Sequence, residues 1–173
     1  TQRNGLSTPA VIDTNGDGVA DRVYAGDVHG NLWAFDLSST KATDWSVAHR
    51  GPLFTSTPRQ PITVRPEIIR HPAMPQSGNQ PNLMIFFGTG QYLVAGDNTT
   101  TDTQSFYAIW DRGDGSLKPA DLVEQVFLRT GQSGGRITDP DRWQRLKVDY
   151  KKSGTGDRYG WYLDLPDRGE RVV

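Results

Sequence analysis

The hydrophobic residues of this chain fall into short runs, many of which alternate with polar residues and are separated by glycine or proline. Alternation with a period of two is typical of half-buried β-strands, and the longer spacing of an amphipathic helix is hard to find over any extended stretch. The 19 glycines and 11 prolines are spread through the chain rather than gathered in one linker. The pattern therefore predicts an all-β fold of short strands joined by tight turns.

The expected strands lie between turn-rich segments. The near-continuous apolar run 82–87 is typical of a buried strand, and 62–70 is strand-like only if Pro66 lies at a bulge or an edge. By spacing, 121–128 fits a helix or a strand, and its β-branched residues favour a strand. The remaining expected strands are 10–12, 22–26, 31–37, 45–48, 104–111, 143–150 and 159–165.

Two of these strands end alike, which indicates a repeated unit. NLWAFD at 31–36 and SFYAIWD at 105–111 both close on aromatic-Ala-apolar followed by Asp. A strand, a Gly-containing turn and a strand of this kind form the hairpin that β-propellers repeat. Because 173 residues make about half of a seven-bladed propeller at roughly four strands per blade, we expect 1–173 to be a single β-propeller segment, a fragment of a larger domain.

The stretch between the first two expected strands carries the clearest chemistry. Asp13, Asn15 and Asp17 alternate, Gly18 follows, and Asp21 comes three residues later. This is the spacing of an EF-hand-type calcium loop, in which a sharp turn at glycine lets short oxygen-bearing side chains converge on a hard cation. The predicted Ca²⁺ ligands are the side chains of Asp13, Asn15, Asp17 and Asp21 and the backbone carbonyl of Val19.

The loop departs from a helix-loop-helix site in two ways. Position twelve is Tyr24 rather than a bidentate Glu, and the flanks 10–12 and 22–25 are β-prone. We therefore place the loop between two strands, with Asp21 as the expected bidentate ligand and the ion as a staple of the hairpin rather than a sensor. The alternative is an Asp-, Asn- and Gly-rich turn that binds no metal.

Composition excludes several other classes of function. The net charge is −1, with 19 basic and 20 acidic residues and no basic block, so nucleic acid is not an expected partner. No apolar run is long enough to predict a transmembrane segment. The absence of cysteine excludes disulfides and thiol catalysis. His29, His49 and His71 lie in unrelated loops without zinc-ligand spacing.

Three further patterns have plain structural interpretations. The Arg-Gly-Asp tripeptide at 112–114 is more simply a turn than an integrin ligand, and Gly-Thr-Gly at 88–90 is a tight turn rather than a dinucleotide fingerprint. Trp143 and Trp161 are expected to pack in the fold rather than to stack on sugars. A glycosidase needs a pair of carboxylates, and the candidates here are Asp139, Asp141, Asp164 and Asp167. Nothing in the sequence brings two of them together. We expect no catalytic residue and no enzyme activity.

Segments 10–37, 86–111 and 159–172 resemble, in the same order, the C-terminal β-propeller domain of the type IV pilus biogenesis factor and tip adhesin, the PilY/PilC family. The resemblance implies a modified propeller near the end of a large secreted protein. It also implies that the family's calcium loop corresponds to 13–21 here, with the same five ligand positions.

The resemblance further implies an extracellular place, at the pilus tip or the outer membrane of a Gram-negative bacterium. Expected partners are pilus components such as minor pilins, and host surface receptors. The expected roles are pilus extension against retraction, adhesion, twitching motility and virulence, with Ca²⁺ as a regulator. The alternatives are a Ca²⁺-dependent propeller enzyme similar to quinone dehydrogenases, or a carbohydrate-binding module. A contiguous loop is more typical of a self-contained structural ion site than of a cofactor funnel.

Overall fold

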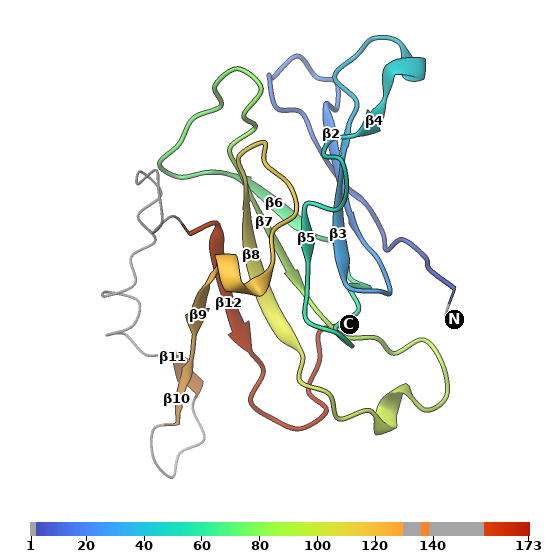
Figure 1. Ribbon diagram of the computed structural model, residues 1–173, viewed down its shortest axis with the longest axis vertical. Coiled ribbons are helices and arrows are strands. Elements are labelled where there is room, and N and C mark those ends of the chain that lie inside the picture. The colour runs from blue at the N-terminus through green and yellow to red at the C-terminus, as the bar shows by residue number, and fades with distance from the viewer. Residues whose placement is uncertain (1–2, 130–135, 139–157) are drawn as a thin grey trace.

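The computed structural model describes residues 3–129, 136–138 and 158–173, which form two main β-sheets packed against each other (Figure 1). The first sheet has the order β1-β2-β3-β4, with β5 also paired to β3. Its strands are β1 (Ala10–Ile12), β2 (Arg22–Gly26), β3 (Asn31–Asp36), β4 (Ser46–Val47) and β5 (Phe54–Thr55).

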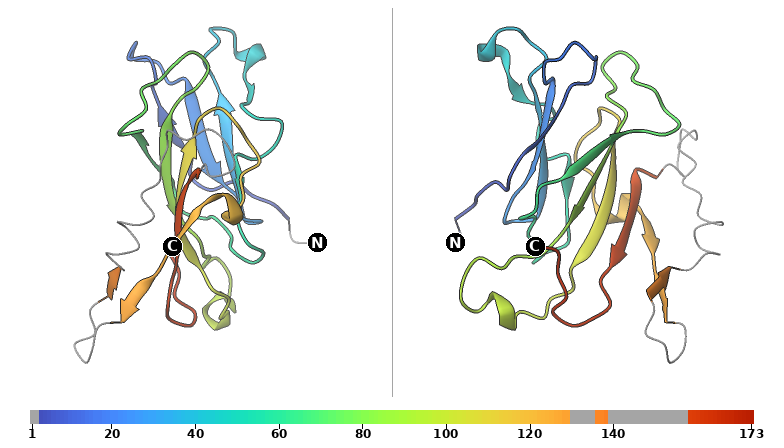
Figure 2. Two further views of the ribbon diagram at one scale, coloured as in Figure 1. Left: turned by 60° about the vertical axis from the view of Figure 1, so that its left-hand side comes forward. Right: turned by 180° about the vertical axis from the view of Figure 1, so that it is seen from behind.

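The second sheet has the order β6-β7-β8-β12-β9. Its strands are β6 (Glu67–Arg70), β7 (Leu83–Gly88), β8 (Ser105–Asp111), β12 (Gly160–Asp164) and β9 (Val123–Gln125). All its pairings are antiparallel except that of β9 with β12. A separate two-stranded ribbon, β10 (Phe127–Arg129) with β11 (Arg136–Thr138), extends away from the main sheets (Figure 2).

The described residues contain no α-helix, only three 3₁₀ turns: η1 (Ala42–Asp44), η2 (Asp97–Thr99) and η3 (Pro119–Asp121). In this part of the chain no helix is long and apolar enough to cross a bilayer. The prediction of an all-β fold is therefore confirmed. The ambiguous stretch 121–128 contains β9 and the start of β10, as its β-branched residues indicated.

The hydrophobic pattern located most strands to within a residue or two, and the main difference lies before β6. The expected strand 62–70 begins only at Glu67, immediately after Pro66. Proline cannot donate to a β-ladder, so the chain pairs only after it. Ile62 instead makes an isolated bridge to Gly90 and is fully buried. The expected strand 143–150 lies outside the described residues.

One hydrophobic core joins the two sheets. Tyr24 and Phe54 from the first sheet pack into the same buried cluster as Ile85 and Tyr107 from the second. The ring centroids of Phe54 and Tyr107 are 4.9 Å apart, and those of Phe54 and Phe87 are 5.9 Å apart. Burial of alternate side chains on each sheet face is the consequence expected of period-two sequences.

Polar contacts join the sheets at one end of this core. Arg70, the last residue of β6, donates from Nη1 to the carbonyl of Thr14 at 2.9 Å and from Nη2 to the carbonyl of Asp13 at 3.4 Å. Tyr24 of β2 donates its hydroxyl to Asp111 of β8 at 2.7 Å. The loop 13–21 is therefore held by the second sheet as well as by its own hairpin.

Candidate calcium loop and adjoining polar pocket

The loop connects β1 to β2, as predicted, and its first carboxylate organises its backbone. Gly16 and Gly18 both have positive φ, at 84° and 89°, which curls the chain around Asp13. Asp13 accepts hydrogen bonds from the N–H of Gly16 at 2.6 Å and of Gly18 at 2.7 Å. The N–H groups of Gly18 and then Gly16 lower the pKa of Asp13 below its ordinary value. The carboxylate is thereby kept ionised, as a cation ligand must be.

The next two predicted ligands extend the same pattern of side chains bonded to nearby backbone. Asn15 Oδ1 accepts from the N–H of Asp17 at 2.8 Å, and Asp17 Oδ1 accepts from the N–H of Val19 at 2.8 Å. Such short-range bonds are typical of Asx turns. The Val19 side chain is exposed, and only its backbone was predicted to take part in the site.

Asp21 is the buried member of the set, with 7% of the residue exposed. Its Oδ2 accepts from the N–H and the hydroxyl of Thr14, at 2.7 and 2.6 Å, and from the N–H of Asn15 at 3.3 Å. Its Oδ1 faces Asn15 Nδ2 at 3.5 Å, and the same nitrogen donates to Asp17 Oδ2 at 3.2 Å. Asp21 therefore closes the loop, and Thr14, which the sequence analysis did not single out, positions it.

The donor set suits Ca²⁺ in its chemistry, since every predicted ligand is an oxygen on a tightly curled segment. Among the residues that the structure describes, no three His, Asp or Glu side chains are gathered as a metal-binding group. The donor nitrogen of Asn15 stands between carboxylate oxygens of Asp17 and Asp21. Asn15 thus directs its amide nitrogen, not its oxygen, toward these two carboxylates, and its Oδ1 accepts from the N–H of Asp17. The bidentate role of Asp21 stays a prediction, because three hydrogen bonds engage its Oδ2.

A buried ionic cluster lies beside the loop, and the sequence analysis missed it. Asp111 is fully buried. Its Oδ2 accepts hydrogen bonds from the Tyr24 hydroxyl and from Arg22 Nη1, the latter at 3.3 Å. Its Oδ1 accepts from the N–H of Gly113 at 2.9 Å and lies 3.5 Å from His49 Nε2. Burial by itself raises the pKa of Asp111, but the His49 imidazole, the Arg22 charge and the Tyr24 hydroxyl outweigh it, so that the pKa is lowered. Burial, reinforced by Asp111, raises the pKa of Tyr24 well above its ordinary value.

The signal that could have revealed this cluster was the similar ending of two strands. The final residues of NLWAFD and SFYAIWD are Asp36 and Asp111, and both interact with Arg22. Arg22 is opposite Asp36 in the β2–β3 register. Asp111 is 89 residues from Arg22 in sequence and reaches it only because the sheets pack together.

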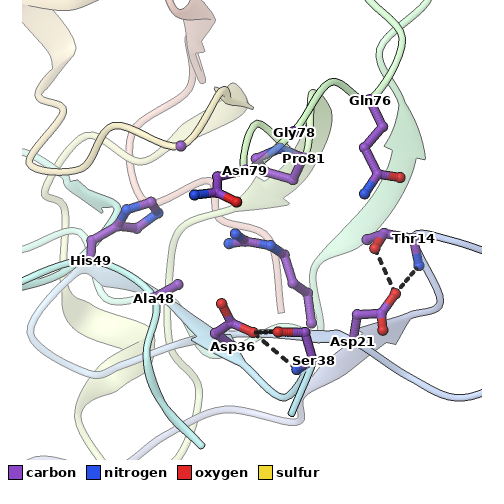
Figure 3. A pocket seen from close by; sticks show the side chains of 12 residues that line it. Thr14, Asp21, Asp36, Ser38, Ala48, His49, Gln76, Gly78, Asn79 and Pro81 are labelled. Atoms are coloured by element: carbon purple, nitrogen blue, oxygen red, sulfur yellow. Dashed lines mark hydrogen bonds between the residues drawn. The ribbon is translucent and has the colours of Figure 1, made fainter.

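Asp21 and this cluster border a polar pocket of about 510 Å³ (Figure 3). The pocket has walls from both halves of the described fold. Asp21 comes from the loop before β2, Asp36 from the end of β3, His49 from the segment after β4, and Asn79 from the loop between β6 and β7. In Figure 3, the side chains of His49 and Asn79 point toward the hollow from one side, and that of Asp36 lies across from them.

The Arg-Gly-Asp turn is a structural part of the fold. Arg112 Nε pairs with Asp114 at 2.6 Å, and Arg112 Nη2 donates to the Tyr159 hydroxyl at 2.6 Å. The guanidinium also lies over the Tyr159 ring, 4.4 Å from its centroid. The interpretation of the tripeptide as a turn fits these contacts, which engage both of its charged side chains.

The remaining carboxylates considered in the sequence lie apart from the loop. Asp164 accepts from the Ser105 hydroxyl at 2.5 Å within the β8–β12 pair. Asp167 lies in the turn beyond β12, where its N–H donates to Glu170. Asp139, Asp141 and Trp143 lie outside the described residues. Trp161 packs beside Phe86 and Phe106, as expected of a structural aromatic residue.

The two mainly antiparallel sheets, without an α-helix among the described residues, define the class of this protein, an all-β domain of the β-propeller type. The sequence model of the PilY1 beta-propeller domain matches residues 1–125. The chain belongs to this family, the β-propeller domains of type IV pilus biogenesis factors.

Individual relatives agree with the family. The type IV pilus biogenesis factor PilY1 homolog of Xylella fastidiosa is 35% identical over 178 residues, which cover 96% of this chain and 11% of the relative. PilY1 of Pseudomonas aeruginosa strain PAO1 is 32% identical over 205 residues, which cover 96% of this chain and 17% of the relative. The crystal structure of the P. aeruginosa PilY1 C-terminal domain aligns with a TM-score of 0.74 at 31% identity, over 94% of this chain and 39% of that one. The chain thus spans less than a fifth of the length of these curated relatives.

Proposed function

We propose that this chain is a Ca²⁺-binding, non-enzymatic part of a type IV pilus biogenesis factor that acts at the cell surface or the pilus tip. It would support pilus extension, adhesion and twitching motility through contacts with pilus components such as minor pilins and with host surface receptors. Membership of the family supports the pilus role, since the named relatives are pilus biogenesis factors. The loop at 13–21 supports the calcium role.

One observation carries the calcium proposal: Asp13, Asn15, Asp17 and Asp21 stand on one curled loop fastened at both ends. Asp21 N–H bonds to the carbonyl of Ile12 at 3.0 Å, and Leu37 N–H bonds to the carbonyl of Asp21 at 2.7 Å. Asp13, Asn15, Asp17, Asp21 and the Val19 carbonyl would hold the ion. When bound, Ca²⁺ would supply a positive charge that offsets the repulsion among the three carboxylates of the loop. The ion would therefore stiffen the β1–β2 hairpin and, through Arg70, its junction with β6.

Calorimetric titration of chelator-treated protein with Ca²⁺, with Mg²⁺ as the control ion, tests the calcium proposal. We expect one site and a higher melting temperature with Ca²⁺, because a ligand that binds only the native state stabilises it by about 2.7 kcal/mol at one hundred times its dissociation constant. Asp17→Ala should weaken binding at least about tenfold, since it removes a charged ligand. This variant is preferable to Asp21→Ala, because Asp17 is exposed and does not anchor Thr14.

Asp114→Ala is the matched control, because it removes a half-exposed turn carboxylate outside the loop. It should bind Ca²⁺ as the unchanged chain does. Absence of binding to the unchanged chain would overturn the calcium proposal and leave family membership intact. The pilus role is tested separately by deleting the coding region in the source bacterium and measuring surface pili and twitching. Normal twitching after deletion would count against that role.

A further inference from the structure

The polar pocket beside the loop is not used by the proposed calcium site, although Asp21 borders both. We propose that this pocket binds a neutral, polyhydroxylated ligand the size of a sugar unit. Its volume of about 510 Å³ lies within the range of small-molecule sites, roughly 300–1,000 Å³. This inference does not depend on Ca²⁺ binding or on the pilus role.

The charges of the lining argue against an ionic ligand. Arg22 is the cationic residue among those that line the pocket, and its guanidinium is engaged by Asp111 at 3.3 Å. Burial raises the pKa of Asp36, but the Ser38 hydrogen bonds and, after them, the charge of Arg22 outweigh burial and lower it. Asp36 and Arg22 are opposite each other in the β2–β3 register. A free anion would meet the carboxylates of Asp21 and Asp36, and a free cation would meet the guanidinium.

The chemistry of the lining also argues against an apolar ligand. Ala48 and Pro81 are the only sizeable apolar contributions among its described side chains. The remaining side chains carry donors and acceptors on the same walls. Sites for apolar ligands are instead lined mostly by hydrophobic and aromatic side chains.

Several polar groups of the pocket are free for a ligand. Gln76 and Asn79 are exposed at the pocket, and within the described structure their side chains make no hydrogen bond, whereas His49 Nε2 is buried and faces Asp111 Oδ1 at 3.5 Å. Asp36 uses Oδ1 for both the N–H and the hydroxyl of Ser38, which leaves Oδ2 available. The exposed amides of Gln76 and Asn79 and the Oδ2 of Asp36 can therefore bond to a ligand without giving up a partner in the described structure.

A hydroxyl group donates one hydrogen bond and accepts others, so adjacent hydroxyls match neighbouring carboxylate, amide and imidazole groups. Asn79 presents both an oxygen and a nitrogen, and Asp36 presents its available Oδ2, a set that suits hydroxyls on adjacent carbon atoms. Their positions are fixed independently, Asp36 by Ser38 and by its place at the end of β3, and the Asn79 loop by the bridge between Ser77 and Gln80. The pocket is therefore largely formed before any ligand binds, which lowers the entropic cost of binding.

The test is saturation-transfer NMR of the chain with methyl glycosides of glucose, galactose, mannose and N-acetylglucosamine. N-acetylneuraminic acid serves as the anionic probe and lysine methyl ester as the cationic probe. Titrations to about 10 mM, ten times a millimolar dissociation constant, cover the weak end of specific binding. Each titration is run in CaCl₂ and again in EGTA, so that a failed calcium loop does not hide the pocket.

At least one neutral glycoside should bind saturably, and Asn79→Ala and Asp36→Asn should each weaken it at least tenfold. Both residues are polar positions at the surface of the pocket, so the variants should still fold, which their NMR spectra will verify. Asn98→Ala, an exposed amide on a different loop, should leave binding unchanged. The proposal is overturned if no neutral glycoside binds, if binding survives both pocket variants, or if either charged probe binds more tightly.

Discussion

At the scale of single residues, buried carboxylates hold this fold in place. Asp27 is fully buried and accepts from the N–H groups of His29 and Asn31, both at 2.9 Å, and from the Trp33 indole at 2.8 Å. Burial would raise its pKa, but the hydrogen bonds of Asn4, Trp33 and Asn31 outweigh that and lower it. Asp111 has the same character, with a partner charge on Arg22.

These lowered pKa values predict acid sensitivity. A group whose folded-state pKa lies below its unfolded value of about 3.9 contributes stability that is fully present above that value and lost as the pH falls through the folded-state pKa. Asp111→Asn should cost about 3–5 kcal/mol at neutral pH, because it leaves the Arg22 charge without its buried partner. The difference in unfolding free energy between the variant and the unchanged chain should narrow as the pH falls below about 3.9, because the unfolded chain there takes up a proton that folded Asp111, with its lowered pKa, does not yet bind.

Urea unfolding between a pH of about 7 and about 3 measures this effect. Asp102→Asn is the control, because Asp102 pairs with Arg59 at the surface, with 38% and 78% of the side chains exposed. It should cost less than about 1 kcal/mol. A cost for Asp111→Asn that stayed constant into acid would refute a shifted Asp111 pKa.

At the scale of elements, close backbone approach determines where strands pair. Gly160 opens β12 with φ of +129°, and a Cβ there would lie 1.9 Å from the carbonyl oxygen of Ala108 in β8. At the other end of the same sheet, Gly88 closes β7 against the side chain of Val172. The C-terminal segment is fastened there, since Val172 N–H donates to the carbonyl of Thr89 at 3.0 Å. Glycine is required at both places because any side chain would collide with a neighbour.

Alanine substitutions at Gly160 and at Gly96 should separate the cost of steric crowding from the cost of an unfavourable backbone conformation. Gly96 also has positive φ, at +107°, but a Cβ there meets nothing within 4 Å. Gly96→Ala should therefore cost only the conformational penalty, about 1–2 kcal/mol. Gly160→Ala should cost about 1–3 kcal/mol more, the usual range for overpacking. It should also reduce amide protection in β12 and β8.

Thermal and urea unfolding of the two alanine variants, together with hydrogen exchange of β8, make the comparison. Equal costs at the two positions would show that β12 can move away from β8 without loss. That result would contradict the close β8–β12 approach.

At the scale of the whole molecule, the two sheets share one core and one polar junction. Phe54 of the first sheet is fully buried against Phe87 and Tyr107 of the second. Tyr107 also donates to Gln60 at 2.6 Å, and burial raises its pKa to about 12. A single core that spans both sheets favours cooperative unfolding of the described region.

Phe54→Ala should destabilise both sheets together. Deleting a buried aromatic ring typically costs about 3–5 kcal/mol. Because the ring contacts the second sheet, amide protection in β7 and β8 should fall as much as in β2 and β3. Native-state hydrogen exchange of the variant measures all four strands at once.

Trp45→Ala is the control, since Trp45 is 49% exposed and its indole bonds only to the carbonyl of Ser39 in the described structure. It should cost about 1 kcal/mol or less. If Phe54→Ala lowered protection in the first sheet alone, the sheets would be independent units.

The sequence by itself determined the local features of this protein. Strand-like hydrophobic patterns located β2, β3 and β8 to within a residue, and a near-continuous apolar run located β7. The Asp, Asn and Gly spacing placed the loop 13–21 between β1 and β2. These features are local because side-chain alternation and turn chemistry depend on residues a few positions apart. Pro66 was expected at a bulge or an edge within strand 62–70, whereas β6 begins only after it, at Glu67.

Only the tertiary structure decided what surrounds that loop. Arg70 reaches Thr14 across 56 residues, and Asp111 reaches Arg22 across 89. The polar pocket likewise needs walls from segments that are far apart in sequence. No periodicity or motif encodes such neighbours, because they depend on how two sheets pack their buried faces together. The loop could therefore be predicted from its own residues, whereas its anchors and its pocket required the assembled core.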